Sequence, residues 1–300
     1  MKKKLKNNNN QKQVIYLICS PLSVRDYERF GISNWINANW KVKVFDITKF
    51  LLPKFWLHTN GDRNSFKFQG LTIFSNVKDI LSTINKIKDK VIFIDMLGFS
   101  YTESKIRKAA ITNGKVVRIN LGTIPKFQPR KNILEILTLI INPIKLTNKI
   151  FQFLNNKIHQ NRAKKYHPDY LVVGGLNSIK KFDKEKTSLI KAHNLDYDFF
   201  IKEKQIASNK DCNFLVFLDE DGPYHSDFIR FGIESYIKPK NYYPVIDLGL
   251  IKIAKLLKLN IKIAAHPRSS YSTKKIKYKH PIIENNTFEL IRNSSVVVAH

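Results

Sequence analysis

Three adjacent carboxylates follow an apolar run in the last third of the chain, where their types suit acid–base chemistry. Asp219, Glu220 and Asp221 come directly after the run at 213–218, and a Gly-Pro pair then forces a turn. Neighbouring carboxylates repel one another, which raises the proton affinity of at least one and makes it a candidate general base. We take Glu220 and Asp221 as catalytic candidates, with an ordinary acidic turn as the competing interpretation.

A second polar group begins at His266, directly after the apolar run at 261–265. An imidazole at a strand tip can protonate a departing phosphate or donate a hydrogen bond to it. Arg268 offers a forked donor for phosphate oxygens, and Ser269 follows it with a hydroxyl. We therefore expect His266 to be catalytic, and Arg268 and Ser269 to bind the phosphate of a donor.

A third group runs from Thr287, at the start of an expected helix, to His300, at the end of an expected strand. A helix N-terminus that carries a hydroxyl favours an anion such as a nucleotide phosphate. Thr287 and His300 therefore complete the candidate donor-phosphate set. Simple capping of the helix by Asn285 or Asn286 is the alternative.

Short apolar runs that alternate with amphipathic stretches must position these residues. The expected strands are 14–19, 42–47, 71–74, 91–95, 116–121, 170–175, 188–190, 213–218, 261–265 and 295–300. The expected helices are 26–37, 77–87, 103–112, 244–257 and 287–292. This alternation predicts an α/β fold with parallel sheets. A right-handed crossover then places the carboxylates and His266 at the same sheet edge.

The pattern divides into two Rossmann-like lobes after a charged, floppy tail at 1–12. The first lobe spans 13–207, and the second spans 208–300 and ends on an apolar strand. Because a parallel strand normally feeds a crossover helix, we expect the second lobe to be incomplete and the chain to be a C-terminally truncated fragment. A naturally short lobe is the alternative. The basic stretch 130–165 is either a helical excursion packed on the first lobe or an interfacial helix lying on a membrane.

The chain is strongly basic, with a formal net charge of +28. The lysines are scattered and no nucleic-acid recognition motif is present, so an anionic membrane surface is a better candidate partner than nucleic acid. Cys19 and Cys212 lie in or beside apolar runs, which is typical of buried thiols in a reducing compartment. No Cys and His pair has metal-ligand spacing, and no apolar run is long enough to span a membrane. We expect a cytoplasmic protein, peripheral on the inner face of the membrane, without a metal.

The residues from 213 to 300 resemble bacterial sialyltransferases of the GT-B type. That family carries an acid-acid-Gly motif, similar to Glu220-Asp221-Gly222, and a His-Pro motif, similar to His266-Pro267. The segment TFELIRNSSVVVAH at 287–300 resembles the donor-phosphate region of surface-polysaccharide glycosyltransferases. In those enzymes serines and threonines follow the strand, and this chain ends before they would appear.

The resemblance implies an inverting glycosyltransferase with a GT-B-like fold that moves a sugar from a nucleotide sugar onto a surface-glycan acceptor. Sialic acid or a similar nonulosonic acid from a CMP donor is the leading candidate. An acidic residue of the Glu220-Asp221 pair would be the base and His266 the partner of the donor phosphate, with no cofactor beyond the nucleotide sugar. Two alternatives stay open: a polyol-phosphate transferase of wall-polymer synthesis, and a basic non-enzymatic adaptor for membranes or nucleic acid. A truncated chain can be inactive or unstable even if its parent is an enzyme.

Overall fold

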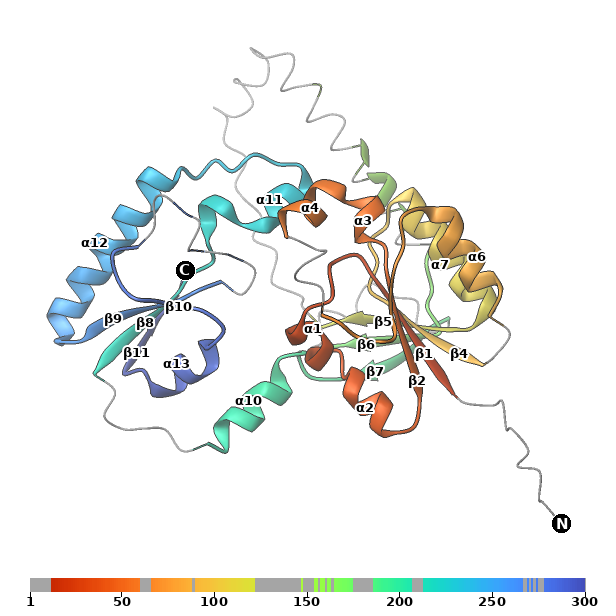
Figure 1. Cartoon of the computed structure of the whole chain (residues 1–300), viewed down its shortest axis with the longest axis horizontal. Helices are drawn as coiled ribbons and strands as arrows, with labels where there is room; N and C mark the ends of the chain where they lie inside the picture. The colour runs from red at the N-terminus through yellow and green to blue at the C-terminus, as the bar shows by residue number, and fades with distance from the viewer. Residues whose placement is uncertain are drawn as a thin grey trace. The chain divides into compact units, whose positions relative to one another are not determined.

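The computed structural model shows an α/β protein with two parallel sheets (Figure 1), which confirms the expected fold class. It describes residues 12–299 except 60–65, 88–89, 122–146, 148–153, 156, 160, 163–164, 175–185, 207–212, 267–268, 270, 272–273 and 275–277. The chain divides into two compact units. Unit 1 comprises Met1–Leu51 and Ser65–Leu195, and unit 2 comprises Leu52–Asn64 and Asp196–His300.

Unit 1 is built on a seven-stranded parallel sheet in the order β3-β2-β1-β4-β5-β6-β7. Its strands are β1 (Gln13–Ile18), β2 (Lys41–Asp46), β3 (Leu71–Ile73), β4 (Val91–Asp95), β5 (Lys115–Asn120), β6 (Tyr170–Val173) and β7 (Ser188–Lys191). Every residue of β1 is buried, because the strand pairs with β2 and β4 and its side chains pack on both faces of the sheet. The apolar runs in the sequence correspond to these strands.

The helices of unit 1 are α1 (Val24–Arg29), α2 (Ile32–Asn37), α3 (Thr48–Leu51), α6 (Val77–Asn85) and α7 (Tyr101–Asn113). Two of them correspond to expected helices, whereas the expected helix at 26–37 is divided and α3 was not expected. The single helix expected at 26–37 is wrong, because Gly31 has a φ of 64° and turns the chain between α1 and α2. Of the basic stretch 130–165, only residue 147 and scattered residues from 154 onward are described, so most of it lies outside the described residues.

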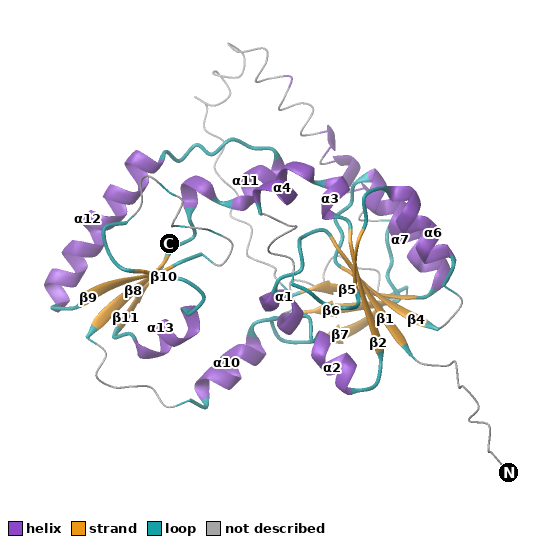
Figure 2. Cartoon of the chain, in the orientation of Figure 1, coloured by secondary structure: helices purple, strands orange, loops and turns teal. Residues whose placement is uncertain are grey.

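Unit 2 contains a four-stranded parallel sheet in the order β10-β9-β8-β11. Its strands are β8 (Phe214–Leu218), β9 (Asn260–Ala264), β10 (Ile282–Ile283) and β11 (Val296–Val298). Its helices are α4 (Pro53–His58), α10 (Tyr197–Lys204), α11 (Ser226–Phe231), α12 (Pro239–Leu257) and α13 (Thr287–Asn293), with the short 3-10 helix η2 (Gly222–Tyr224). Figure 2 shows α12 and α13 beside the strands of this sheet.

Alternate residues of β8 pack against different helices of unit 2. Leu215 and Phe217 share a core cluster with Leu250 of α12. Phe214 lies in a second cluster with Leu290 of α13. Because successive side chains of a strand point to opposite faces, α12 and α13 cover opposite faces of this sheet.

Several features of unit 2 differ from the sequence-based expectation, including α10, α11 and β10, which were not expected. α12 begins at Pro239 rather than at Pro244, which lies inside the helix. The segment that contains α4 comes from the first 64 residues of the chain but belongs to unit 2. There the guanidinium of Arg230 in α11 lies 5.7 Å from the centre of the Phe55 ring of α4. Among the helices in the described parts of the chain, none combines the length and apolar character needed to cross a membrane.

Candidate functional site

The two polar loops expected to carry chemistry start side by side at the carboxyl edge of the unit 2 sheet. In the register of β8 and β9, Leu218 is opposite Ala264. One residue beyond the strand, the backbone N–H of Asp219 donates to the Ala264 carbonyl at 3.1 Å. Carboxyl ends of parallel strands are the usual place for ligands in open α/β sheets. The loops that begin at Asp219 and Ala265 therefore form the candidate site.

Asp219 is buried within a network of tyrosine hydroxyls. Its Oδ1 accepts hydrogen bonds from the hydroxyls of Tyr242 at 3.0 Å and Tyr278 at 2.8 Å. The Tyr271 hydroxyl donates to Oδ2, and the backbone N–H of Asp221 donates to Oδ1 at 3.0 Å. Burial, followed by the charge of Asp219, raises the pKa of all three tyrosines, so their hydroxyls stay protonated and donate. Asp219 is therefore an anchor rather than a base.

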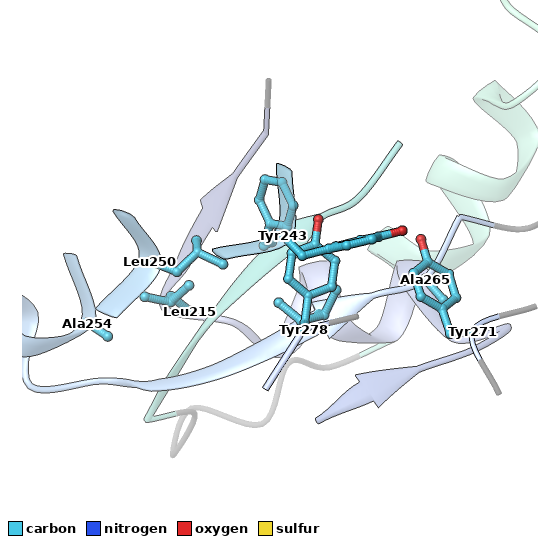
Figure 3. Close-up of a cluster of buried hydrophobic side chains, with 9 residues drawn as sticks. Leu215, Tyr243, Leu250, Ala254, Ala265, Tyr271 and Tyr278 are labelled. Atoms are coloured by element: carbon cyan, nitrogen blue, oxygen red, sulfur yellow. The ribbon is translucent and has the colours of Figure 1, made fainter. Parts of the chain in front are cut away.

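The network lies at one end of the core of unit 2 (Figure 3). In this view the aliphatic side chains of Leu215 and Leu250 are at one end of the cluster, and Tyr271 is at the other, with Tyr243 and Tyr278 between them. Tyr243 comes from α12, whereas Tyr271 and Tyr278 follow β9. The cluster thus ties α12 and the segment after β9 to the carboxyl end of β8.

Asp221 is also engaged in internal contacts, with only 1% of its surface exposed. Its Oδ1 accepts a hydrogen bond from the Tyr243 hydroxyl at 2.9 Å and lies 2.6 Å from Nζ of Lys274. The sequence suggested that three neighbouring acids repel one another. The structure changes this interpretation, because hydroxyls and an ammonium group compensate the two aspartates. Asp221 is poorly placed to take a proton from a substrate.

Glu220 is the exposed member of the acidic triplet. Asp219 and Asp221 on either side of it are turned inward, and Asp221 adopts the left-handed conformation with a φ of 54°. Gly222 then packs closely on Tyr242, since a Cβ at this position would lie 3.1 Å from its ring. Anchors on both sides thus hold the backbone of Glu220, while its carboxylate faces solvent at the sheet edge.

His266 lies directly after β9 and is half-buried. Its Nδ1 is 3.4 Å from the Ser269 hydroxyl, and its backbone N–H donates to the Tyr271 hydroxyl oxygen at 3.4 Å. Tyr271 in turn donates to Asp219, so a chain of hydrogen bonds links the acidic loop to the His266 backbone. Of the predicted site residues, the structure brings His266 and Ser269 together.

A second imidazole, His225, lies beside His266, with 5.0 Å between the ring centres and 57° between the ring planes. His225 is the N-cap of α11, and its Nδ1 accepts a hydrogen bond from the backbone N–H of Asp227 at 3.2 Å. Because Nδ1 is an acceptor, the hydrogen of the neutral ring belongs on Nε2, which makes Nε2 a donor. His225 was not among the residues predicted for the site.

Of the three remaining predicted residues, the structure describes only Thr287. Arg268 and His300 lie outside the described residues. Thr287 is the first residue of α13, on the connection that follows β10 at the same sheet edge. The preceding Asn286 makes no side-chain cap to the α13 backbone, and its amide donates instead to the Glu289 carboxylate at 2.6 Å.

Unit 1 contains a separate polar cluster at the carboxyl end of β4. Nε of Arg107 lies 2.7 Å from Oδ2 of Asp95, and Nη1 of Arg118 lies 3.2 Å from the same oxygen. Burial alone would raise the pKa of Asp95, but the charges of Arg118 and Arg107 outweigh burial and lower it. The Arg107 guanidinium also stacks on the rings of Phe99 and Tyr166, at 4.6 and 4.5 Å. We interpret this cluster as structural support that joins β4, β5 and α7.

Comparison with known proteins adds no identification. No known family matches the chain, and no curated protein matches it significantly. Within the described ranges, no group of three or more His, Cys, Asp or Glu side chains is arranged to hold a metal ion. The geometry of unit 2 is therefore the basis for a functional proposal.

Proposed function

We propose that the protein is an inverting glycosyltransferase that binds a nucleotide sugar at the carboxyl edge of the unit 2 sheet. The observation that carries this proposal is the pairing of His225, at the end of the loop after β8, with His266, at the start of the loop after β9. Two imidazoles and the Ser269 hydroxyl within reach of His266 supply hydrogen-bond donors for phosphate oxygens. The resemblance of the Glu220-Asp221-Gly222 and His266-Pro267 motifs to bacterial sialyltransferases supports the same conclusion.

The proposed reaction divides the work between the two loops. Glu220 takes the proton of the acceptor hydroxyl while the acceptor oxygen forms a bond to the anomeric carbon of the donor sugar. The bond from that carbon to the phosphate oxygen breaks, and its electron pair stays on the phosphate. His266, with His225 beside it, donates to that oxygen and stabilises the developing charge. Asp219 and Asp221 act indirectly, by holding the backbone on either side of Glu220.

Release of free nucleotide is the direct test. The intact, full-length protein would be incubated with CMP-, UDP- and GDP-activated sugars, CMP-sialic acid first, together with glycan acceptors. We expect acceptor-dependent nucleotide release, and we expect Glu220→Gln and His266→Ala each to lower it by about a hundredfold or more. Glu234→Gln, at another exposed carboxylate of unit 2, is the matched control and should leave the rate unchanged.

Two outcomes would contradict the proposal. One is no nucleotide release with any donor and acceptor. The other is equal loss of activity in the Glu234→Gln control. Mass analysis of the product distinguishes the polyol-phosphate transferase, because that reaction retains phosphate in the new linkage.

The proposal includes a nucleotide sugar and a glycan acceptor as reaction partners, without a metal or other cofactor. It also includes a cytoplasmic setting, on the inner face of the membrane, where activated nucleotides and membrane-linked acceptors meet. The net charge of +28 supports attraction to anionic head groups at that surface. Detection of the native protein in the membrane fraction, with release at high salt, would test the location.

A further inference from the structure

α12 presents a second apolar surface on the side that faces away from the unit 2 sheet. Its inner side is buried through Tyr243, Leu250 and Ala254. On the opposite side, Val245, Leu248 and Leu256 are 67%, 55% and 82% exposed. At 3.6 residues per turn, these three positions fall along one side of the helix. We call this surface the outer face of α12.

The outer face of α12 is basic as well as apolar. Lys252 and Lys255 are exposed and lie among its apolar side chains. Three more exposed lysines stand close to the helix ends: Lys238, Lys240 and Lys258. The acidic residue of α12, Asp247, is buried on the other side, where it accepts from the backbone N–H of Lys279 at 3.1 Å. The outer face thus combines large apolar groups with positive charge and carries no carboxylate.

We propose that the outer face of α12 docks on a membrane surface that contains anionic lipids. Exposed apolar side chains flanked by lysines are the pattern of a helix that lies in the plane of the interface. In this arrangement Val245, Leu248 and Leu256 enter the boundary between head groups and acyl chains. Lys252 and Lys255 remain at the phosphate level, where each lysine contributes electrostatic attraction. This inference does not depend on the reaction proposed for unit 2.

A second copy of the chain fits this surface less well. Two outer faces brought together by a twofold axis would place lysines of one copy against lysines of the other. A helix of this length is about 28 Å long and about 10 Å wide, so the contact would cover roughly 300 Å². Stable interfaces between proteins bury about 800 Å² per partner. Lipid phosphates complement the charge and require no minimum contact area.

Vesicle flotation tests the proposal with the full chain. The probes are vesicles of phosphatidylcholine alone and vesicles that also contain phosphatidylglycerol. We expect binding to the anionic vesicles, and a drop in the partition coefficient of roughly tenfold or more for Leu248→Ser with Leu256→Ser. Lys252→Glu with Lys255→Glu should cause a similar drop. Higher salt should weaken wild-type binding, because the attraction is screened.

The matched control lies on α4, where Lys54 and Leu57 are also exposed on a helix of unit 2. The double variant Lys54→Glu with Leu57→Ser should bind anionic vesicles as tightly as the wild type. All variants should have the melting temperature of the wild type. Three results would overturn the proposal: no wild-type binding to anionic vesicles, outer-face variants that bind as tightly as the α4 control, or loss of binding in the lysine variant alone. Sedimentation provides a further check. If the wild type is a dimer and the leucine variant is a monomer, the outer face of α12 is a contact between two copies of the chain and not a membrane-binding surface.

Discussion

Two buried carboxylates in unit 1 are stabilised to very different extents. Asp95 at the end of β4 faces two guanidinium groups, and its pKa is lowered despite burial. Asp46 at the end of β2 is fully buried, and its Oδ1 accepts the backbone N–H of Thr48 at 2.8 Å. Within the described chain, Oδ2 of Asp46 has no hydrogen-bond partner. Burial, only partly offset by the bonds from Thr48, raises the pKa of Asp46 to about 6.

Because of this raised pKa, the stability of unit 1 depends on pH. Because the folded-state pKa lies above the ordinary 3.8, the contribution of Asp46 to stability is fully present below pH 4 and is lost as the pH rises through about 6. The loss is about 3 kcal/mol. Asp46→Asn keeps an oxygen for Thr48 and stays neutral. We expect its free energy of unfolding, relative to wild type, to increase by about that amount between pH 4 and pH 8, as measured by urea titration.

The comparison needs a control for general charge effects. Asp198→Asn changes an exposed aspartate of α10. The difference between its free energy of unfolding and that of the wild type should stay constant across the same pH range. If the difference for Asp46→Asn is also constant, ionisation of the Asp46 carboxyl does not destabilise the fold, and the explanation from burial is wrong.

At the residue scale, the sequence located the candidate site but could not assign roles within it. Glu220 and His266 were predictable because each follows an apolar run that forms a parallel strand. The inward position of Asp219 was not, because its partners Tyr271 and Tyr278 are 52 and 59 residues away. Nothing in local spacing distinguishes the anchoring aspartates from the exposed glutamate. His225 was missed because its contact with His266 arises only when β8 and β9 pair.

At the element scale, strands and long helices follow directly from apolar periodicity, whereas short helices depend on their ends. α11 is only six residues long, begins with a histidine cap and ends at Gly232, which has a φ of 64°. No helix was expected here, because six residues give too little periodicity to recognise. The break between α1 and α2 at Gly31 has the same kind of cause.

A pair of glycines in unit 2 isolates the effect of backbone conformation. A Cβ at either Gly232 or Gly249 would meet nothing within 4 Å, but only Gly232 has a positive φ. We expect Gly232→Ala to lower the free energy of unfolding by about 1 kcal/mol, because alanine is strained in the left-handed region. Gly249→Ala, in the middle of α12, should raise it by about 0.5 to 1 kcal/mol. Urea titration of both variants is the measurement.

The opposite signs are what make this pair informative. Changes of the same sign in both variants would show that side-chain contacts, and not the φ of Gly232, determine the outcome. Circular dichroism of both proteins should match the wild type.

At the scale of the whole molecule, the chain passes between its two units more than once. The sequence suggested one division near residue 207, but unit 2 begins at Asp196 and also includes residues 52–64. Composition gives no sign of this, because α4 is a short amphipathic helix like others nearby in the sequence. Its assignment depends on contacts such as that of Phe55 with Arg230, which lie far apart along the chain.

A substitution at Phe55 tests this assignment. Phe55 is buried, and Phe55→Ala should destabilise unit 2 by about 3 to 5 kcal/mol through the cavity it leaves. Hydrogen exchange followed by mass spectrometry should show faster exchange in β8 and β9, with β1 and β2 unchanged. Phe93→Ala, at a buried position of β4, is the control and should give the reverse pattern. Faster exchange in β1 and β2 of the Phe55 variant would assign α4 to unit 1.

The place of α4 in unit 2 also has a consequence for synthesis on the ribosome. This helix leaves the exit tunnel long before its partner α11, and at ordinary elongation rates the wait is roughly 10 to 30 seconds. During that time most of unit 2 has not yet been synthesised. Phe55 and Trp56, both buried in the finished protein, therefore lack their native contacts with unit 2. A nascent chain at this stage displays an aromatic pair of the kind that chaperones bind.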